Sequence, residues 1–220
     1  MDLPPLSCGG MYGAVAIAEE ESDSAAGQVL LLGGSDEDDV LLMTVQLVDL
    51  ATGASAPQNN LLQPRYLPAA SRLPDGRIVC VGGIGGLQSA EVWGAPDQGG
   101  GDAAWIWTEL PAMSAGRYGC CGCVMSDGRF AVLGGGGVGG PFSSCEALVM
   151  GDAAHWVPLP PMHDSRGFFA CTAVAGCVIV AGGTGRTSAE VYDESLDRWL
   201  RLPNDLPYEN GLALMGSALL

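Results

Sequence analysis

Few side chains in this sequence could act as catalytic groups. The two histidines are His155 and His163. His163 is followed by Asp164 and Ser165, the residue types of a hydrolase triad, but neighbours in sequence do not have triad geometry. We expect His163 to be a loop histidine with ordinary polar partners, and we predict no catalytic residue.

Two further motifs look like ligand-binding sequences. GGGGVGG at 134–140 contains the G-x-G-x-x-G spacing of dinucleotide sites, but we predict that a turn and a strand follow it, where such a site needs a helix. SDEDDV at 35–40 offers carboxylates without the regular spacing of a calcium loop, so we interpret it as a solvated acidic turn. We therefore predict neither a cofactor nor a metal site.

The eight cysteines are an even number, which would fit a disulfide framework. Most of them lie in apolar strand-like runs, where cysteine behaves as a small hydrophobic residue. In CCGC at 120–123, adjacent residues of a strand point to opposite faces, so Cys120 and Cys121 are poorly placed to share a metal ion. We expect reduced thiols that pack in the core; a reactive or metal-bound cysteine is the alternative.

The chain has 220 residues and is strongly acidic, with a formal net charge of −16. A surface of this charge repels phosphate backbones, so we expect no nucleic-acid partner. Because 48% of the residues are hydrophobic, the chain is not a disordered polymer. Its 34 glycines and 14 prolines predict short strands joined by many turns.

The segment MDLPPLSCGG at 1–10 does not resemble a secretory signal, and we expect a cytoplasmic protein. Nineteen uncharged residues lie between Arg166 and Arg186, a length that could cross a bilayer. A turn glycine in the middle of this window predicts two strands and a hairpin, so we expect no membrane span.

The elements that position these side chains form an internal repeat. Four apolar runs end in a glycine pair, whose first residues are spaced by 49, 52 and 48 positions: Gly33, Gly82, Gly134 and Gly182. A period near fifty is too long for a helical hairpin and is typical of a four-stranded blade. Arginine precedes the last three pairs by 17, 17 and 16 residues, at Arg65, Arg117 and Arg166.

Other features recur in the same order after each pair. SAEVW (89–93), SCEALVM (144–150) and SAEVYD (188–193) come first, and a tryptophan with a Leu-Pro step follows in WTELPAM (107–113), WVPLPPM (156–162) and WLRLPNDL (199–206). PDGR at 74–77 and SDGR at 126–129 predict tight hairpin turns. RIVCVGG at 77–83 is apolar on both faces, so we expect its strand to lie between two other layers. We expect the tryptophans to lie on outer strands and to cover the gap to the next blade.

These residues resemble the kelch repeat, and the resemblance covers nearly the whole chain. It implies an all-β fold, a kelch-type β-propeller of about four four-stranded blades plus a terminal strand. We expect one domain, 1–220, with units at 11–60, 65–111, 117–160 and 166–203 and a partial unit at 208–220. The first unit is degenerate and lacks a tryptophan after Asp49, and Asn210 occupies the arginine position of the last unit.

The number of units departs from the family pattern, because its propellers usually close with roughly six or seven blades. We favour an incomplete propeller, whose open edge strands would favour self-association. A small ring closed by the terminal strand, or a propeller made from two chains, are the alternatives.

The resemblance implies a non-catalytic protein-interaction module or scaffold without a cofactor. The loops after the second strand of each blade, and the loops between blades, open on one face, where we expect a protein or peptide partner. Arg117 and Arg166 also have a structural interpretation, which is hydrogen bonding between adjacent blades. The candidate contact residues are Arg65, Gln88, Ser89, Arg117, Ser143, Ser144, His163, Asp164, Arg166, Arg186 and Ser188.

Two alternatives to this function remain open. Similarity to galactose oxidase, a copper enzyme with a kelch-like domain, would predict two tyrosines and two histidines around the metal. A truncated propeller with no function of its own is the other alternative. No F-box, BTB or other partner domain is apparent in the sequence, so an adaptor role is not indicated by these residues.

Overall fold

The computed structural model describes residues 11–17, 27–95 and 104–207, and these form antiparallel strands joined by turns. There are four four-stranded sheets, and in each of them the strands neighbour one another in chain order. The predicted all-β class and the predicted four-stranded sheets are therefore confirmed. The predicted partial unit at 208–220, with Asn210, lies outside the described residues.

The sheets take their strands from consecutive parts of the chain. The first sheet has β1(Met11–Ile17), β2(Gln28–Ser35), β3(Val45–Asp49) and β4(Ser55–Gln58). The second has β5(Ala69–Arg72), β6(Ile78–Val81), β7(Ala90–Gly94) and β8(Ile106–Leu110). The third has β9(Cys121–Val124), β10(Phe130–Leu133), β13(Cys145–Val149) and β14(His155–Leu159), and the fourth has β15(Ala170–Val174), β16(Cys177–Ala181), β17(Ala189–Asp193) and β18(Arg198–Arg201).

The predicted hairpin turns are present. Gly76 and Gly128 have φ angles of +89° and +85°, a region that glycine enters without steric cost. The Asp75 carboxylate accepts a hydrogen bond from the backbone N–H of Arg77, which tightens the first of these turns. The short turns hold each inner strand against its neighbour in a fixed register.

Strand β6 packs between two other sheets, as its double-sided apolar pattern predicts. Ile78 and Cys80 pack toward the first sheet, whereas Val79 and Val81 pack toward the third. All four side chains are fully buried. Burial of side chains of this size stabilises a fold by roughly 1.5–3 kcal/mol each, so the central strands account for much of the core.

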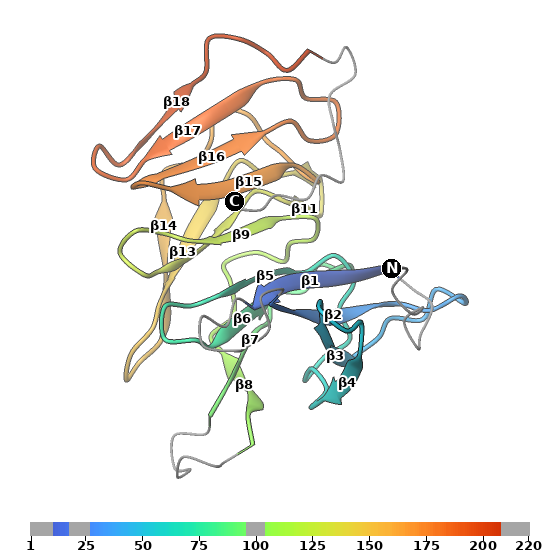
Figure 1. Cartoon of the computed structure of the whole chain (residues 1–220). Coiled ribbons are helices and arrows are strands. Elements are labelled where there is room, and N and C mark those ends of the chain that lie inside the picture. Colours follow the sequence, from blue (N-terminus) through green and yellow to red (C-terminus); the bar gives the residue numbers. More distant parts are fainter. Residues whose placement is uncertain (1–10, 18–26, 96–103, 208–220) are drawn as a thin grey trace.

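Figure 1 shows the four sheets following one another in chain order, with the first and the fourth at opposite ends. The strands β1, β5, β9 and β15 contact one another in this order, so each sheet presents its first strand to the same side. The apolar window at 167–185 forms β15 and β16, a hairpin, as predicted. Among the described residues there is no helix with the length and apolarity needed to cross a membrane.

The glycine-rich motif at 134–140 leads into a small extra hairpin, β11(Gly136–Gly137) and β12(Gly140–Pro141). The sequence predicts a turn and a strand after this motif, but the separate hairpin is not evident from it. A hairpin and a strand follow these glycines, in place of the helix N-terminus that holds the phosphates in a G-x-G-x-x-G site. The tip residue Val138 is fully exposed.

The cysteines of the described residues are free thiols, and most of them are buried in the core. Burial raises the pKa of Cys80 to about 12 and those of Cys120 and Cys145 to about 11. A thiol with such a pKa is protonated near neutral pH and therefore a poor nucleophile. The predicted core role of the cysteines is confirmed for these residues.

Candidate functional site

The glycine pairs join each sheet to the next one. The second glycine of a pair donates its N–H to the backbone carbonyl of the following unit's arginine. The first glycine has a positive φ and leaves no room for a side chain, because a Cβ on Gly82 would lie 2.4 Å from the Arg117 carbonyl oxygen. The three hydrogen bonds run from Gly34 to Arg65 (2.7 Å), from Gly83 to Arg117 (2.7 Å) and from Gly135 to Arg166 (2.8 Å).

The side chain of each arginine points into the sheet that follows it in the chain. The Arg166 guanidinium is fully buried, and its Nη1 donates to the carbonyls of Gly182 and Ser188, at 2.7 Å each. Its Nη2 donates to the Ser188 hydroxyl at 2.7 Å and to the Glu190 carboxylate at 2.9 Å. The guanidinium is thereby matched to a carboxylate, as a charge in a protein interior must be.

The same cluster is built in the second and third sheets. Arg65 donates to Glu91 at 2.6 Å, and Arg117 donates to Glu146 at 3.2 Å. In both cases the guanidinium also reaches the carbonyl of the first glycine and a serine hydroxyl. The further acceptors are Gly82 and Ser89 for Arg65, and Gly134 and Ser144 for Arg117.

The glutamate of each cluster also fixes the loop that enters the sheet. One carboxylate oxygen of Glu190 accepts the backbone N–H of His163 at 2.8 Å, and the other accepts that of Asp164 at 3.1 Å. Burial alone would raise the pKa of Glu190, but the hydrogen bonds from His163, Arg166 and Asp164 outweigh it and hold the pKa below its usual value. Sequence reasoning identifies these glutamates as part of a repeated motif but misses their role as the partners of the arginines.

Most of the predicted contact residues belong to these clusters. Arg65, Arg117 and Arg166 are at most 1% exposed, so their side chains offer no surface to a partner. The sequence analysis gave hydrogen bonding between adjacent blades as the alternative role of these arginines. Each arginine does link two sheets, because its backbone carbonyl is bound by the preceding sheet and its guanidinium lies in the sheet that follows it. The hydroxyls of Ser89, Ser144 and Ser188 accept hydrogen bonds from the same guanidinium groups.

The remaining predicted residues lie nearer the surface. The His163 side chain is 45% exposed, with Nδ1 at 2.8 Å from Glu190. Asp164 accepts hydrogen bonds from Ser188 and Arg201. Burial would raise its pKa, but Ser188 and the nearby arginines lower it below the usual value. Gln88 is exposed, Ser143 is half-buried, and Arg186 is half-buried with its guanidinium at 3.5 Å from the Ser165 hydroxyl.

The loops at this end of the sheets are joined by backbone hydrogen bonds. Met113 donates to the carbonyl of Gln88 at 2.8 Å, and Met162 donates to that of Ser143 at 2.9 Å. The corresponding bond in the fourth sheet joins Leu206 to Thr187, at 2.7 Å. The loops after the second strands and the loops between sheets therefore lie together, as the topology predicts, and we call this surface the loop face.

The outer-strand tryptophans also join neighbouring sheets. The prediction that they cover the gap to the next sheet is wrong, because their hydrogen bonds run to the preceding sheet. Each indole Nε1 donates to a loop carbonyl of the preceding unit, at 2.8–2.9 Å. The pairs are Trp107 with Asn59, Trp156 with Pro111, and Trp199 with Pro160.

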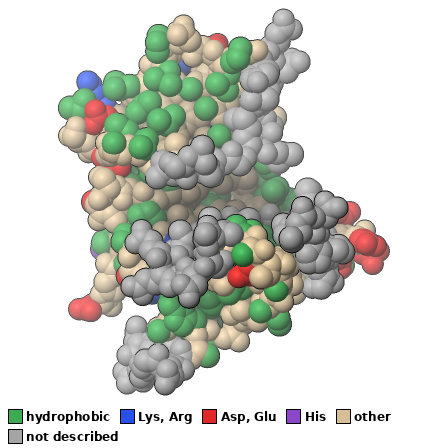
Figure 2. Space-filling view, in the orientation of Figure 1, with side chains coloured by type: hydrophobic (Ala, Val, Ile, Leu, Met, Phe, Trp, Pro, Cys, Tyr) green, Lys and Arg blue, Asp and Glu red, His purple; other side chains and the backbone are tan. Residues whose placement is uncertain are grey.

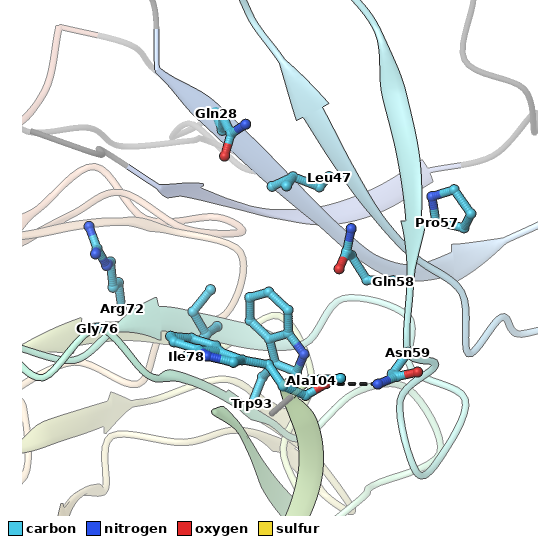
Figure 3. A pocket seen from close by; sticks show the side chains of 11 residues that line it. Gln28, Leu47, Pro57, Gln58, Asn59, Arg72, Gly76, Ile78, Trp93 and Ala104 are labelled. Carbon is cyan, nitrogen blue, oxygen red and sulfur yellow. Dashed lines mark hydrogen bonds between the residues drawn. The ribbon is translucent and has the colours of Figure 1, made fainter. Parts of the chain in front are cut away.

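A groove of about 780 Å³ lies between the first and second sheets. Figure 3 shows Gln28, Leu47 and Gln58 on one side of it and Ile78 and Trp93 on the other. Trp105, at the start of β8, also lines the groove and is 36% exposed. This groove lies between sheets, and the repeat pattern did not predict it.

The distribution of charged and hydrophobic side chains is uneven. Figure 2 shows acidic side chains at projecting edges and hydrophobic side chains spread over the fourth sheet. The exposed apolar residues there include Val174, Leu200 and Leu202. In the part of the chain that the structure describes, no three His, Cys, Asp or Glu side chains come together in a way that could hold a metal ion.

Comparison with known proteins gives a local match. A segment of 54 residues is 48% identical to an F-box/kelch-repeat protein of Arabidopsis thaliana. The match covers 22% of this chain and 14% of the relative's length, so it concerns a small part of both proteins. No family model matches the chain.

Proposed function

We propose that this chain is a non-catalytic protein-interaction module, built from kelch-type propeller blades, that binds a protein or peptide through the loop face. The repeat order and the local similarity to an F-box/kelch-repeat protein support the kelch assignment. In the described part of the chain, Figure 1 shows the first and fourth sheets apart, with the second and third between them, which supports an incomplete propeller.

The observation that carries the proposal is that the loop face has two kinds of residue, buried charges that are paired and loop side chains that are exposed. The buried charges at the loop face are matched within the arginine clusters, so they hold the sheets together and are not free to act on a substrate. The same clusters and the backbone bonds hold the loops firmly, and these loops project Gln88, Val138 and His163 outward. A rigid scaffold with exposed loop residues is typical of recognition surfaces.

The test is a comparison of loop-face variants in cells. Partners captured by the parent chain are compared with those of a Gln88→Ala/Val138→Asp variant and of a Leu196→Ala control, an exposed apolar residue on a hairpin turn of the fourth sheet. We expect a defined set of partners that the loop-face variant loses and the control keeps. The same partners on all three proteins would contradict the proposal.

A metal assay on the purified protein tests the non-catalytic part separately. A galactose-oxidase-like enzyme would hold one copper per chain and consume oxygen with an alcohol substrate. Stoichiometric copper together with oxidase activity would contradict the proposal, whereas we expect neither.

A further inference from the structure

The inner strands of the four sheets pack against one another by a single rule. In the last four residues before each glycine pair, the first and third side chains pack on the preceding sheet, and the second and fourth pack on the next one. All the side chains that meet in this way are at most 1% exposed, so each junction is a dry apolar contact. The matched sets are Leu30 and Leu32 with Ile78 and Cys80, Val79 and Val81 with Phe130 and Val132, and Ala131 and Leu133 with Val178 and Val180.

The same rule identifies one open face on the fourth sheet and one on the first. Ile179 and Ala181 of β16 occupy the positions that face a next sheet, and both are half-buried. Val29 and Leu31 of β2 occupy the positions that face a preceding sheet, and both are also half-buried. The first and fourth sheets lie at opposite ends of the series (Figure 1), so in the part of the chain that the structure describes no sheet packs on either face.

The open face of the fourth sheet is apolar across three of its strands. Ile179 is in register with Val191, and Val191 is in register with Leu200. The residues at the Val191 position of the second and third sheets are Val92 and Ala147, which are only 7% and 0% exposed because the next sheet covers them. Val191 itself is half-buried, and Leu200 is 40% exposed. Uncovered apolar surface of this kind marks a site of contact with another molecule.

The chain itself carries the surface that fits this face. Val29 and Leu31 of the first sheet stand at the positions of Ile78 and Cys80, which pack on the second and fourth positions of the preceding strand. A second copy of the chain therefore presents to Ile179 the kind of surface that meets this position at each of the three junctions within the chain. An unrelated partner would have to reproduce the strand spacing and side-chain alternation that the copy already has.

We propose that two copies of this chain associate head to tail, with the open face of the fourth sheet of each copy packed on the open face of the first sheet of the other. The contact joins two different faces, and contacts of this kind form closed assemblies when the rotation between copies closes. Two copies bring together twice four sheets, eight in all. Propellers close with roughly four to eight blades, so a pair is the expected assembly. This contact is separate from the loop face and goes beyond the proposed function.

The experiment is sedimentation equilibrium of the purified chain over a range of concentrations. We expect a reversible dimer with twice the mass of one chain. Ile179→Asp and Leu31→Asp each place a charge in one of the two apolar faces, and each should weaken the dimer at least about tenfold. Val138→Asp is the control, because it adds the same charge at the exposed tip of the hairpin of β11 and β12 and should leave the dimer unchanged.

A mixture of the two face variants tests the head-to-tail arrangement. The Ile179→Asp chain keeps its first-sheet face, and the Leu31→Asp chain keeps its fourth-sheet face. A one-to-one mixture can therefore form one intact contact, and it should associate more strongly than either variant alone. Contact between two fourth sheets would leave Leu31→Asp dimeric, and contact between two first sheets would leave Ile179→Asp dimeric. Either result would overturn the proposal, and so would a mixture that associates no better than its components.

A parent chain that stays monomeric at every concentration would also overturn the proposal. Circular dichroism shows whether each variant is folded. Leu200→Asp, on the outer strand β18, replaces Ile179→Asp if that variant is not folded, and Val29→Asp replaces Leu31→Asp. The failure of this proposal is distinguishable from that of the proposed function, because the capture of loop-face partners is measured on Val138→Asp, in which the contact between copies is intact.

Discussion

Replacement of Gly82 by alanine tests whether the glycine pairs are needed for the contact between sheets. Gly82 has a φ of +68°, and a Cβ built on it would lie 2.4 Å from the Arg117 carbonyl oxygen of the next unit. The nearby Gly86 has almost the same φ, +70°, but a Cβ on it would meet nothing within 4 Å. Gly86→Ala is therefore a control with the same backbone cost and no collision.

The expected losses of stability follow from two effects, the left-handed backbone conformation and the collision of the added Cβ. An L-residue in the left-handed region costs about 1–2 kcal/mol, which is the whole expected effect of Gly86→Ala. In Gly82→Ala the Arg117 carbonyl must also move, and it then gives up the 2.7 Å hydrogen bond from the N–H of Gly83. A buried donor left without a partner costs about 1–3 kcal/mol, so Gly82→Ala should lose about 2–5 kcal/mol in total.

The assay is urea unfolding of the parent and both variants, followed by circular dichroism and by tryptophan fluorescence. Coincident transitions by the two probes would justify a two-state free energy. Gly82→Ala should unfold at a clearly lower urea concentration than Gly86→Ala. Equal losses of stability in the two variants would refute the reasoning, because the glycine would then be needed only for its φ angle.

Three further predictions concern the buried charges and thiols. Arg117→Met leaves Glu146 buried without its partner and should lower the free energy of unfolding by about 3–5 kcal/mol. Its control, Arg129→Met, breaks a partly exposed ion pair and should lower it by about 1 kcal/mol or less. Similar urea midpoints for the two variants would contradict the structural role of Arg117. The pKa of Glu190 is lowered in the folded protein, so the stabilisation by its carboxylate is complete above the unfolded pKa near 4.5 and is lost as the pH falls through the folded pKa. The free energy of unfolding of Glu190→Gln should therefore fall less than that of the parent between about pH 5 and about pH 3. Cys80→Ser should leave the number of thiols that react with a disulfide reagent unchanged in the native protein and lower it by one in denaturant, and a lower native count would show that Cys80 is accessible.

The fold was predictable because it repeats. An apolar run on both faces, a tight turn and a glycine pair each indicate a strand or its end, and their recurrence at one period indicates a blade even where a single copy, such as the first unit, is degenerate. The hairpin at β11 and β12 was not predictable in this way, because it occurs in one unit only. Glycines that continue past a repeated pair carry no signal that distinguishes a hairpin from a loop.

The candidate site was predictable only in part, for a physical reason. Sequence shows that Arg166, Ser188 and Glu190 recur in the same order in the last three units, but recurrence does not say whether a charge faces solvent or the interior. Burial depends on how the loop entering one sheet lies over the strands of that sheet, and these contacts join residues more than twenty positions apart. The groove beside Trp93 is harder still to predict, because residues of both the first and the second sheet line it and its shape depends on how the two sheets pack.

The arginine clusters also limit where specificity can come from. Residues that recur in the last three units, such as Arg117 with Glu146, join one sheet to the next, and any partner that displaced them would break that junction. Under the proposed function, recognition must therefore depend on residues that differ between units. These lie in the loops 84–88, 136–143 and 184–187, which share neither length nor sequence. A partner that discriminates this chain from another with the same repeat should therefore be sensitive to changes in those loops, and insensitive to conservative changes in the repeated positions that leave the fold intact.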